Sequence, residues 1–138
     1  MRVVLRPLAP REVDHELLWP AVFTGALVLG ALWFALRLPW PSCAFHALTG
    51  QPCPTCGATR ALVSLLHGDF AAAVSWNPLA VLAYCAIAAF NVYGIVAVLV
   101  GCRRLRVVQL SGFQKRFCRV LFAAAVVLNW IYLVIAKV

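Results

Sequence analysis

Acidic side chains are scarce in this chain of 138 residues, which has four aspartates and glutamates in total. Three of them, Glu12, Asp14 and Glu16, lie near the amino terminus, and Asp69 is alone in the rest of the chain. The sequence has no paired carboxylates, no phosphate-cradling glycine loop and no triad of nucleophile, base and orienting residue. These absences argue against a hydrolase or a kinase.

Charge of either sign is also rare, at 12% of residues, whereas 64% are hydrophobic. A soluble protein of this size has no core large enough to bury that much apolar surface, so we expect the lipid bilayer to be its main surroundings. The chain has no internal repeat, no low-complexity tract and no long linker. We therefore predict one membrane domain over residues 1–138.

Three apolar runs have the length of membrane-spanning helices. They cover residues 19–36, 78–101 and 120–136, after a leader of residues 1–18. The first run is interpreted as a retained anchor, because it follows a polar leader that contains Glu12, Asp14 and Glu16 and because its exit lacks a small-residue cleavage site. The predicted fold is all-α, with three spans and one or two short interfacial or re-entrant helices in the first connection, residues 37–77.

The net charge of +8 comes from basic residues at the ends of the apolar runs. They form no aromatic-interleaved stripe, so no nucleic-acid partner is expected. The positive-inside rule predicts a multi-pass protein of the cell membrane with a cytoplasmic amino terminus, a cytoplasmic connection at 102–119 and an extracytoplasmic connection at 37–77. The residues that carry this bias are Arg2, Arg6, Arg11, Arg103, Arg104, Arg106, Lys115, Arg116 and Arg119.

Soft metal-ligating side chains gather in the first connection. Cys43 and His46 are separated by two residues, and so are Cys53 and Cys56, a spacing with which tight turns present two ligands to one tetrahedral ion. Four such ligands would close the site around zinc, with iron or copper(I) also tolerated, and would leave no open position for a substrate. This interpretation predicts a structural or accessory role and not an enzyme.

Two alternatives involve the thiols without a metal. In the first, Cys53 and Cys56 form a thiol–disulfide exchange pair at a helix amino terminus, where the helix dipole and Arg60 would lower a thiol pKa, with Cys43 as a third partner. In the second, two of the cysteines form a structural disulfide in a membrane scaffold or subunit. Cys85, Cys102 and Cys118 are expected to be apolar packing residues.

The segment after Cys56 reads as a short helix over residues 58–67 that ends at Gly68. Arg60, Ser64 and His67 share one of its faces, so they and Asp69 form a possible polar site, with Arg60 able to bind a phosphate or carboxylate headgroup. The alternative is an internal ion pair between Arg60 and Asp69, with His67 at the helix end. Asp69 is also a cap for a segment running to about residue 75.

Asparagine occurs at three positions at or within the second and third spans. Asn77 precedes Pro78 and is expected to cap the helix that starts there. Asn91 and Asn129 lie inside apolar runs, where their amides can hydrogen-bond between helices. This pattern favours a packed bundle, a homo-oligomer or a complex with another membrane protein over a conducting pore.

Four motifs in order resemble those of a family of small bacterial membrane proteins, domain of unknown function family 2752 (DUF2752). The resemblance covers about residues 40–85 and implies a membrane location and a grouping of these residues, but no reaction. One departure is Ala44, where the family often has proline. The motifs are Cys43-x-x-His46, Cys53-Pro54-x-Cys56-Gly57-x-Thr59-Arg60, His67-Gly68-Asp69 and Asn77-Pro78-Leu79.

Overall fold

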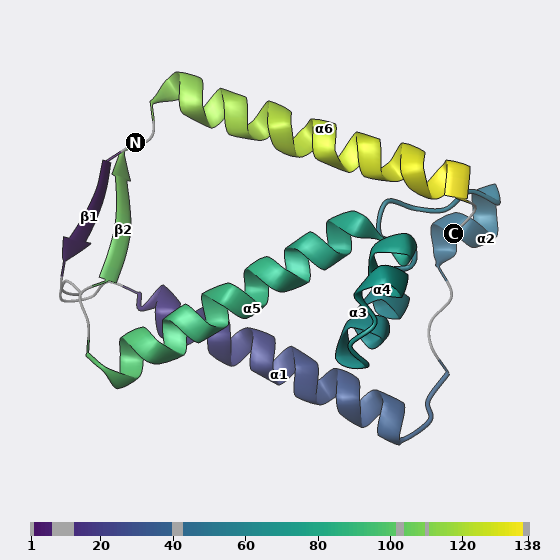
Figure 1. The fold of residues 1–138 in the computed structure, drawn as a ribbon, viewed down its shortest axis with the longest axis horizontal. Coiled ribbons are helices and arrows are strands. Elements are labelled where there is room, and N and C mark those ends of the chain that lie inside the picture. Colours follow the sequence, from purple (N-terminus) through teal and green to yellow (C-terminus); the bar gives the residue numbers. More distant parts are fainter. Residues whose placement is uncertain (1, 7–12, 40–42, 102–103, 110, 137–138) are drawn as a thin grey trace. The chain divides into compact units, whose positions relative to one another are not determined.

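Three long apolar helices make up most of the structure, a computed structural model that describes residues 2–6, 13–39, 43–101, 104–109 and 111–136 (Figure 1). They are α1 (His15–Ala35), α5 (Pro78–Leu99) and α6 (Gly112–Ala136), and each is long and apolar enough to cross a membrane. Most of their side chains are not buried within the protein, as expected where lipid is the solvent. The expected helical membrane fold with three spans is confirmed, with one pair of short strands in addition, and the chain is a multi-pass membrane protein.

The helix that contains the third predicted span begins before the apolar run. The expected start was residue 120, but α6 begins at Gly112. Ser111 and Gln114 form a reciprocal cap, in which the Gln114 amide donates to Ser111 Oγ (3.2 Å) and the Ser111 amide donates to Gln114 Oε1 (3.1 Å). Lys115, Arg116 and Arg119 therefore lie on the first turns of α6, while Arg11, Cys102 and Arg103 lie outside the described residues.

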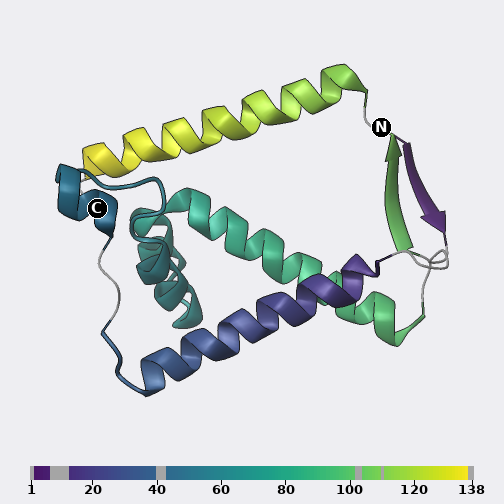
Figure 2. The ribbon, with the colours of Figure 1, turned by 180° about the vertical axis from the view of Figure 1, so that it is seen from behind.

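Three short helices lie between α1 and α5, one more than the expected one or two. They are α2 (Ala44–Thr49), α3 (Ala58–Leu66) and α4 (Phe70–Trp76). α3 and α4 lie side by side as a hairpin (Figure 2), and Ala61 and Ala73, both fully buried, form its core with Leu65 and Trp76 packed against them. Gly68 turns the chain between the two helices at φ +79°, a conformation that suits glycine.

A pair of strands was not expected from the sequence. β1 (Arg2–Arg6) and β2 (Arg104–Gln109) pair antiparallel, with Leu5 opposite Leu105 and Arg6 opposite Arg104 (Figure 1). Part of the basic connection that we expected at 102–119 is therefore a strand. Both segments have ordinary strand lengths, but a two-stranded pair is stable only through its partners, and neither segment by itself indicates which segment it pairs with.

The chain divides into two compact units, Met1–Pro39 with Ala86–Lys115, and Trp40–Cys85 with Arg116–Val138. In the first unit α1 approaches α5 closely at Gly94. A Cβ atom on Gly94 would lie 2.7 Å from the carbonyl oxygen of Glu16 and 2.9 Å from Pro20 Cγ, and both of those residues are buried. Glycine at this position allows the two backbones to come together.

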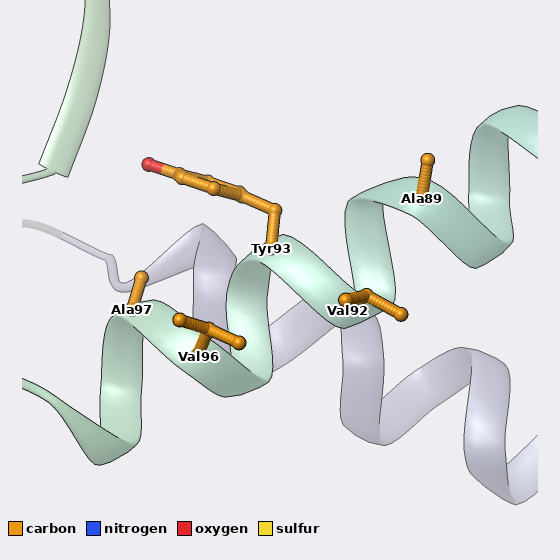
Figure 3. Close-up of a pocket in the computed structure, with 5 residues that line it drawn as sticks. All are labelled: Ala89, Val92, Tyr93, Val96 and Ala97. Carbon is orange, nitrogen blue, oxygen red and sulfur yellow. The ribbon is translucent and has the colours of Figure 1, made fainter.

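The first unit also carries a hollow of about 530 Å³ on the second half of α5, lined by apolar groups apart from the hydroxyl of Tyr93 (Figure 3). Asn91 lies nearby in sequence, and its Oδ1 atom is buried with no hydrogen-bond partner among the described residues. The hydrogen bond between helices that we expected for Asn91 is therefore not found there. The hollow contains no group suited to bind a metal ion or to perform thiol chemistry. Its lining residues are Ala89, Val92, Tyr93, Val96 and Ala97.

Candidate metal centre

Three thiols converge in the second unit. The sulfur atoms of Cys43, Cys53 and Cys56 all lie within 4.8 Å of one another, and each residue is partly buried. Cys43 immediately precedes α2 and caps it through its carbonyl, which accepts from the Ala47 amide (3.0 Å). Cys53 and Cys56 are the two ends of a turn closed by a 2.9 Å hydrogen bond from the Cys56 amide to the Cys53 carbonyl. Local turns thus bring the thiols to one place.

The dimensions of the cluster fit a thiophilic ion. Zinc–sulfur bonds of about 2.3 Å in tetrahedral geometry place sulfur atoms about 3.8 Å apart. Sulfur atoms that already lie within 4.8 Å of one another need to close by at most about 1 Å. The donor set itself, three cysteine sulfurs, is one that suits zinc, copper(I) or iron.

His46, the fourth expected ligand, is not part of the clustered donor set. It lies on the first turn of α2, and its side chain is exposed. The structure therefore brings together three of the four expected ligands. The position of His46 in the chain, three residues after Cys43, keeps it close to the cluster along the backbone.

The two thiols of the turn differ in acidity. Burial by itself raises the pKa of Cys53, but hydrogen bonds with Thr55, Cys43 and Cys56 outweigh it and lower that pKa to about 7 from the ordinary 9.0. The Thr55 hydroxyl lies 3.2 Å from Cys53 Sγ. Burial raises the pKa of Cys56 to about 11, and a thiolate at Cys53 contributes to this rise because it disfavours a second negative charge nearby. The Cys53 amide donates to Cys56 Sγ (3.1 Å), which lowers the pKa, but the other effects outweigh it.

The cause of this difference is not the one that we expected. The lowered pKa belongs to Cys53 and comes from hydrogen bonds within the turn, whereas Cys56, which is closer to the start of α3, has the raised pKa. Arg60 makes another contact, with its guanidinium carbon 4.7 Å from the centroid of the Trp76 ring. The acidity of the thiols is therefore set by burial and by interactions within the cluster.

Alkylation of the reduced, metal-free protein should reveal this difference. The thiolate is the reactive form, so the rate at Cys53 should rise with pH through a midpoint near 7, while Cys56 should stay unreactive until the pH approaches 11. Mass spectrometry of the two positions after brief iodoacetamide treatment measures both rates. Faster alkylation of Cys56 than of Cys53 at pH 7.5 would contradict the assignment.

Backbone carbonyls of the cysteine loop, defined here as residues 52–58, are held by side chains at every second residue. Trp130 Nε1 donates to the Pro52 carbonyl (2.8 Å), and the Tyr84 hydroxyl donates to Ala58 (3.3 Å). Between them, Asn77 Nδ2 donates to Cys56 (2.9 Å) and Pro54 (3.3 Å), and Asn129 Nδ2 donates to Pro54 (3.1 Å). The loop is thus attached to the start of α5 and to the last turns of α6.

The predicted polar residues of α3 and its surroundings have local partners. His67 Nδ1 lies 2.8 Å from the Val63 carbonyl at the end of α3, and Asp69 Oδ1 accepts from the Ala72 amide (2.9 Å) at the start of α4. Ser64 is half-buried, and its carbonyl accepts from the Asp69 amide (2.9 Å). These contacts shape the α3–α4 hairpin. The structure gives Arg60 an aromatic partner, Trp76, in place of the ion pair with Asp69 that was the alternative expectation.

Removal of the Arg60 charge should weaken this hairpin modestly. A cation over an aromatic ring at an exposed site contributes about 0.5–1 kcal/mol, so Arg60→Gln should lower the free energy of unfolding by that amount. A double-mutant cycle with Trp76→Leu isolates the pair. If Arg60→Gln costs as much in the Trp76→Leu background as in the original chain, the two side chains do not interact.

Only part of this network was predictable from the sequence. Asn77 was expected at the start of a helix, and its Oδ1 indeed accepts from the Ala80 amide (2.9 Å), but its contact with the cysteine loop was not expected. Asn129 was expected to bond between helices, and the Leu79 amide does donate to Asn129 Oδ1 (3.1 Å). Trp130 was not singled out for the site. Its position beside a buried asparagine in an apolar helix was the available signal.

A family model covers the residues of this site. Residues 43–91 match the model of the family described as "Protein of unknown function (DUF2752)". No curated protein and no solved structure matches the chain. The matched range contains the three clustered cysteines, the α3–α4 hairpin and Asn77. The resemblance of this chain to the DUF2752 family is thereby confirmed.

Proposed function

We propose that this protein binds one zinc ion in its first connection through Cys43, Cys53 and Cys56, with His46 as the fourth ligand, and that the site has an accessory or structural role. The observation that carries the proposal is the convergence of the three sulfur atoms within 4.8 Å. A bound ion would hold together segments on both sides of α2. Metal analysis of the detergent-purified protein tests it, and one zinc per chain is expected.

The fourth ligand has its own test, the substitution His46→Ala. Loss of one of four ligands should weaken zinc binding about 100-fold while the three thiolates still hold one ion per chain. Competition with a chromophoric chelator measures the affinity. Unchanged affinity would show that a water or another group, and not His46, completes the coordination. Iron in place of zinc in the purified protein would keep the site and change only the ion.

A second candidate function is thiol–disulfide exchange, favoured by the acidity difference between Cys53 and Cys56. The Cys53 thiolate would attack the disulfide of a substrate, forming a mixed disulfide and releasing one substrate thiolate. Cys56 would then attack that bond, leaving an oxidised Cys53–Cys56 pair and a fully reduced substrate. Metal-free protein with a reducible Cys53–Cys56 disulfide would favour this function over metal binding.

The proposed location of the site is the extracytoplasmic face of the cell membrane. The basic residues of the leader and of the 102–119 region support a cytoplasmic location for both. With three spans, the end of α6 is on the same side as the cysteine loop, in agreement with the contacts of Asn129 and Trp130. A carboxy-terminal alkaline phosphatase fusion should be active, and a fluorescent-protein fusion that folds only in the cytoplasm should be dark.

A further inference from the structure

The side chain of Asn129 joins the cysteine loop to two membrane-spanning helices. It extends from α6, donates through Nδ2 to the Pro54 carbonyl and accepts at Oδ1 from the Leu79 amide on the first turn of α5. Asn77 makes the same kind of bridge, donating to Cys56 and accepting from Ala80. The partners require these amide orientations, because a backbone N–H only donates and a carbonyl only accepts.

The surroundings make these bonds costly to lose. Asn77 and Asn129 are 1% and 5% exposed, so little water can reach them to replace a lost bond. Pro52 and Pro54 have no N–H group, so their carbonyls are the only backbone hydrogen-bonding groups that can hold them. Trp130 and Asn129 engage those two carbonyls.

We propose that Asn129 and Asn77 are positioning residues of the metal centre. They hold the backbone at Pro54 and Cys56, so that the thiols of Cys53 and Cys56 are oriented toward Cys43 before an ion binds. This inference rests on the proposed metal function. Preorganisation lowers the conformational cost of binding, so the metal affinity of the loop depends on a residue of α6. By linkage, a bound ion strengthens the attachment of α6 to the cysteine loop.

The substitution Asn129→Ala in the full-length, detergent-purified protein tests the proposal, with Asn91→Ala as a matched control. Both remove an asparagine from an apolar helix, but Asn91 is in the other unit, and its Oδ1 atom has no hydrogen-bond partner among the described residues. Zinc titration against a chelator should give binding about 10–100-fold weaker for Asn129→Ala and unchanged for Asn91→Ala. Cobalt(II) spectra should keep the thiolate charge-transfer band in both.

The outcomes separate the two proposals. Failure of the original chain to bind zinc or cobalt overturns both. Binding by the original chain with equal affinity in Asn129→Ala overturns the positioning role alone, and so does a lower melting temperature of the metal-free protein without a change in zinc affinity. If Asn129→Ala does not fold, Trp130→Phe keeps an aromatic ring but loses the indole N–H donated to Pro52, and it should weaken zinc binding several-fold with the cobalt band intact.

Discussion

Cys56→Ser should weaken metal binding by at least two orders of magnitude. Structural zinc sites contribute roughly 10–16 kcal/mol, so each of four ligands supplies about 3 kcal/mol, equivalent to about two orders of magnitude in affinity. Serine does not replace a thiolate as a ligand, and the substitution also removes the sulfur atom that accepts from the Cys53 amide. Dialysis at pH 7.5 against a chelator that leaves about one ion per chain in the original protein should remove the ion from the variant.

Cys85→Ser is the matched control for this substitution. Cys85 is an exposed residue of α5 outside the thiol cluster, so its replacement should leave the metal content unchanged. Thermal unfolding distinguishes the metal function from thiol exchange. A metal centre predicts that added zinc raises the melting temperature of the original chain and not that of Cys56→Ser, whereas equal melting behaviour of metal-loaded and metal-free protein would refute a stabilising ion.

Gly94→Ala should destabilise the first unit, because the added methyl group would lie 2.7 Å from the backbone oxygen of Glu16 and 2.9 Å from Pro20 Cγ. A backbone atom does not move aside as a flexible side chain does, so α1 must shift away from α5. Overpacking of this kind costs about 1–3 kcal/mol. Thermal unfolding of the detergent-solubilised protein measures the loss.

Gly30→Ala provides the opposite expectation in the same helix pair. Gly30 lies within α1, and a Cβ atom there meets nothing within 4 Å. Alanine is favoured over glycine in a helix by about 1 kcal/mol, so this variant should be as stable as the original or slightly more stable. Equal destabilisation by both substitutions would show that α1 and α5 do not approach each other at Gly94.

Local features of the fold followed from neighbouring residues and were predictable. The three spans depend on the length of the apolar runs. The start of α4 depends on Asp69, which directly precedes the helix and accepts from the amide of Ala72, three residues further on. The cap formed by Ser111 and Gln114 is equally local, but the apolar run at residue 120 obscured it. The pairing of β1 with β2 joins distant segments, and neither segment indicates its partner.

The sequence by itself determined which chemistry is available: three spans in lipid, and a short loop rich in thiols with the spacing of metal ligands. These follow from composition and from separations of a few residues along the backbone. Only the tertiary structure decided that the sulfur atom of Cys43 lies beside those of Cys53 and Cys56, and that Asn129 reaches Pro54 from 75 residues away. Such contacts depend on how α5 and α6 pack, because a buried amide bonds to whichever carbonyl that packing brings within reach.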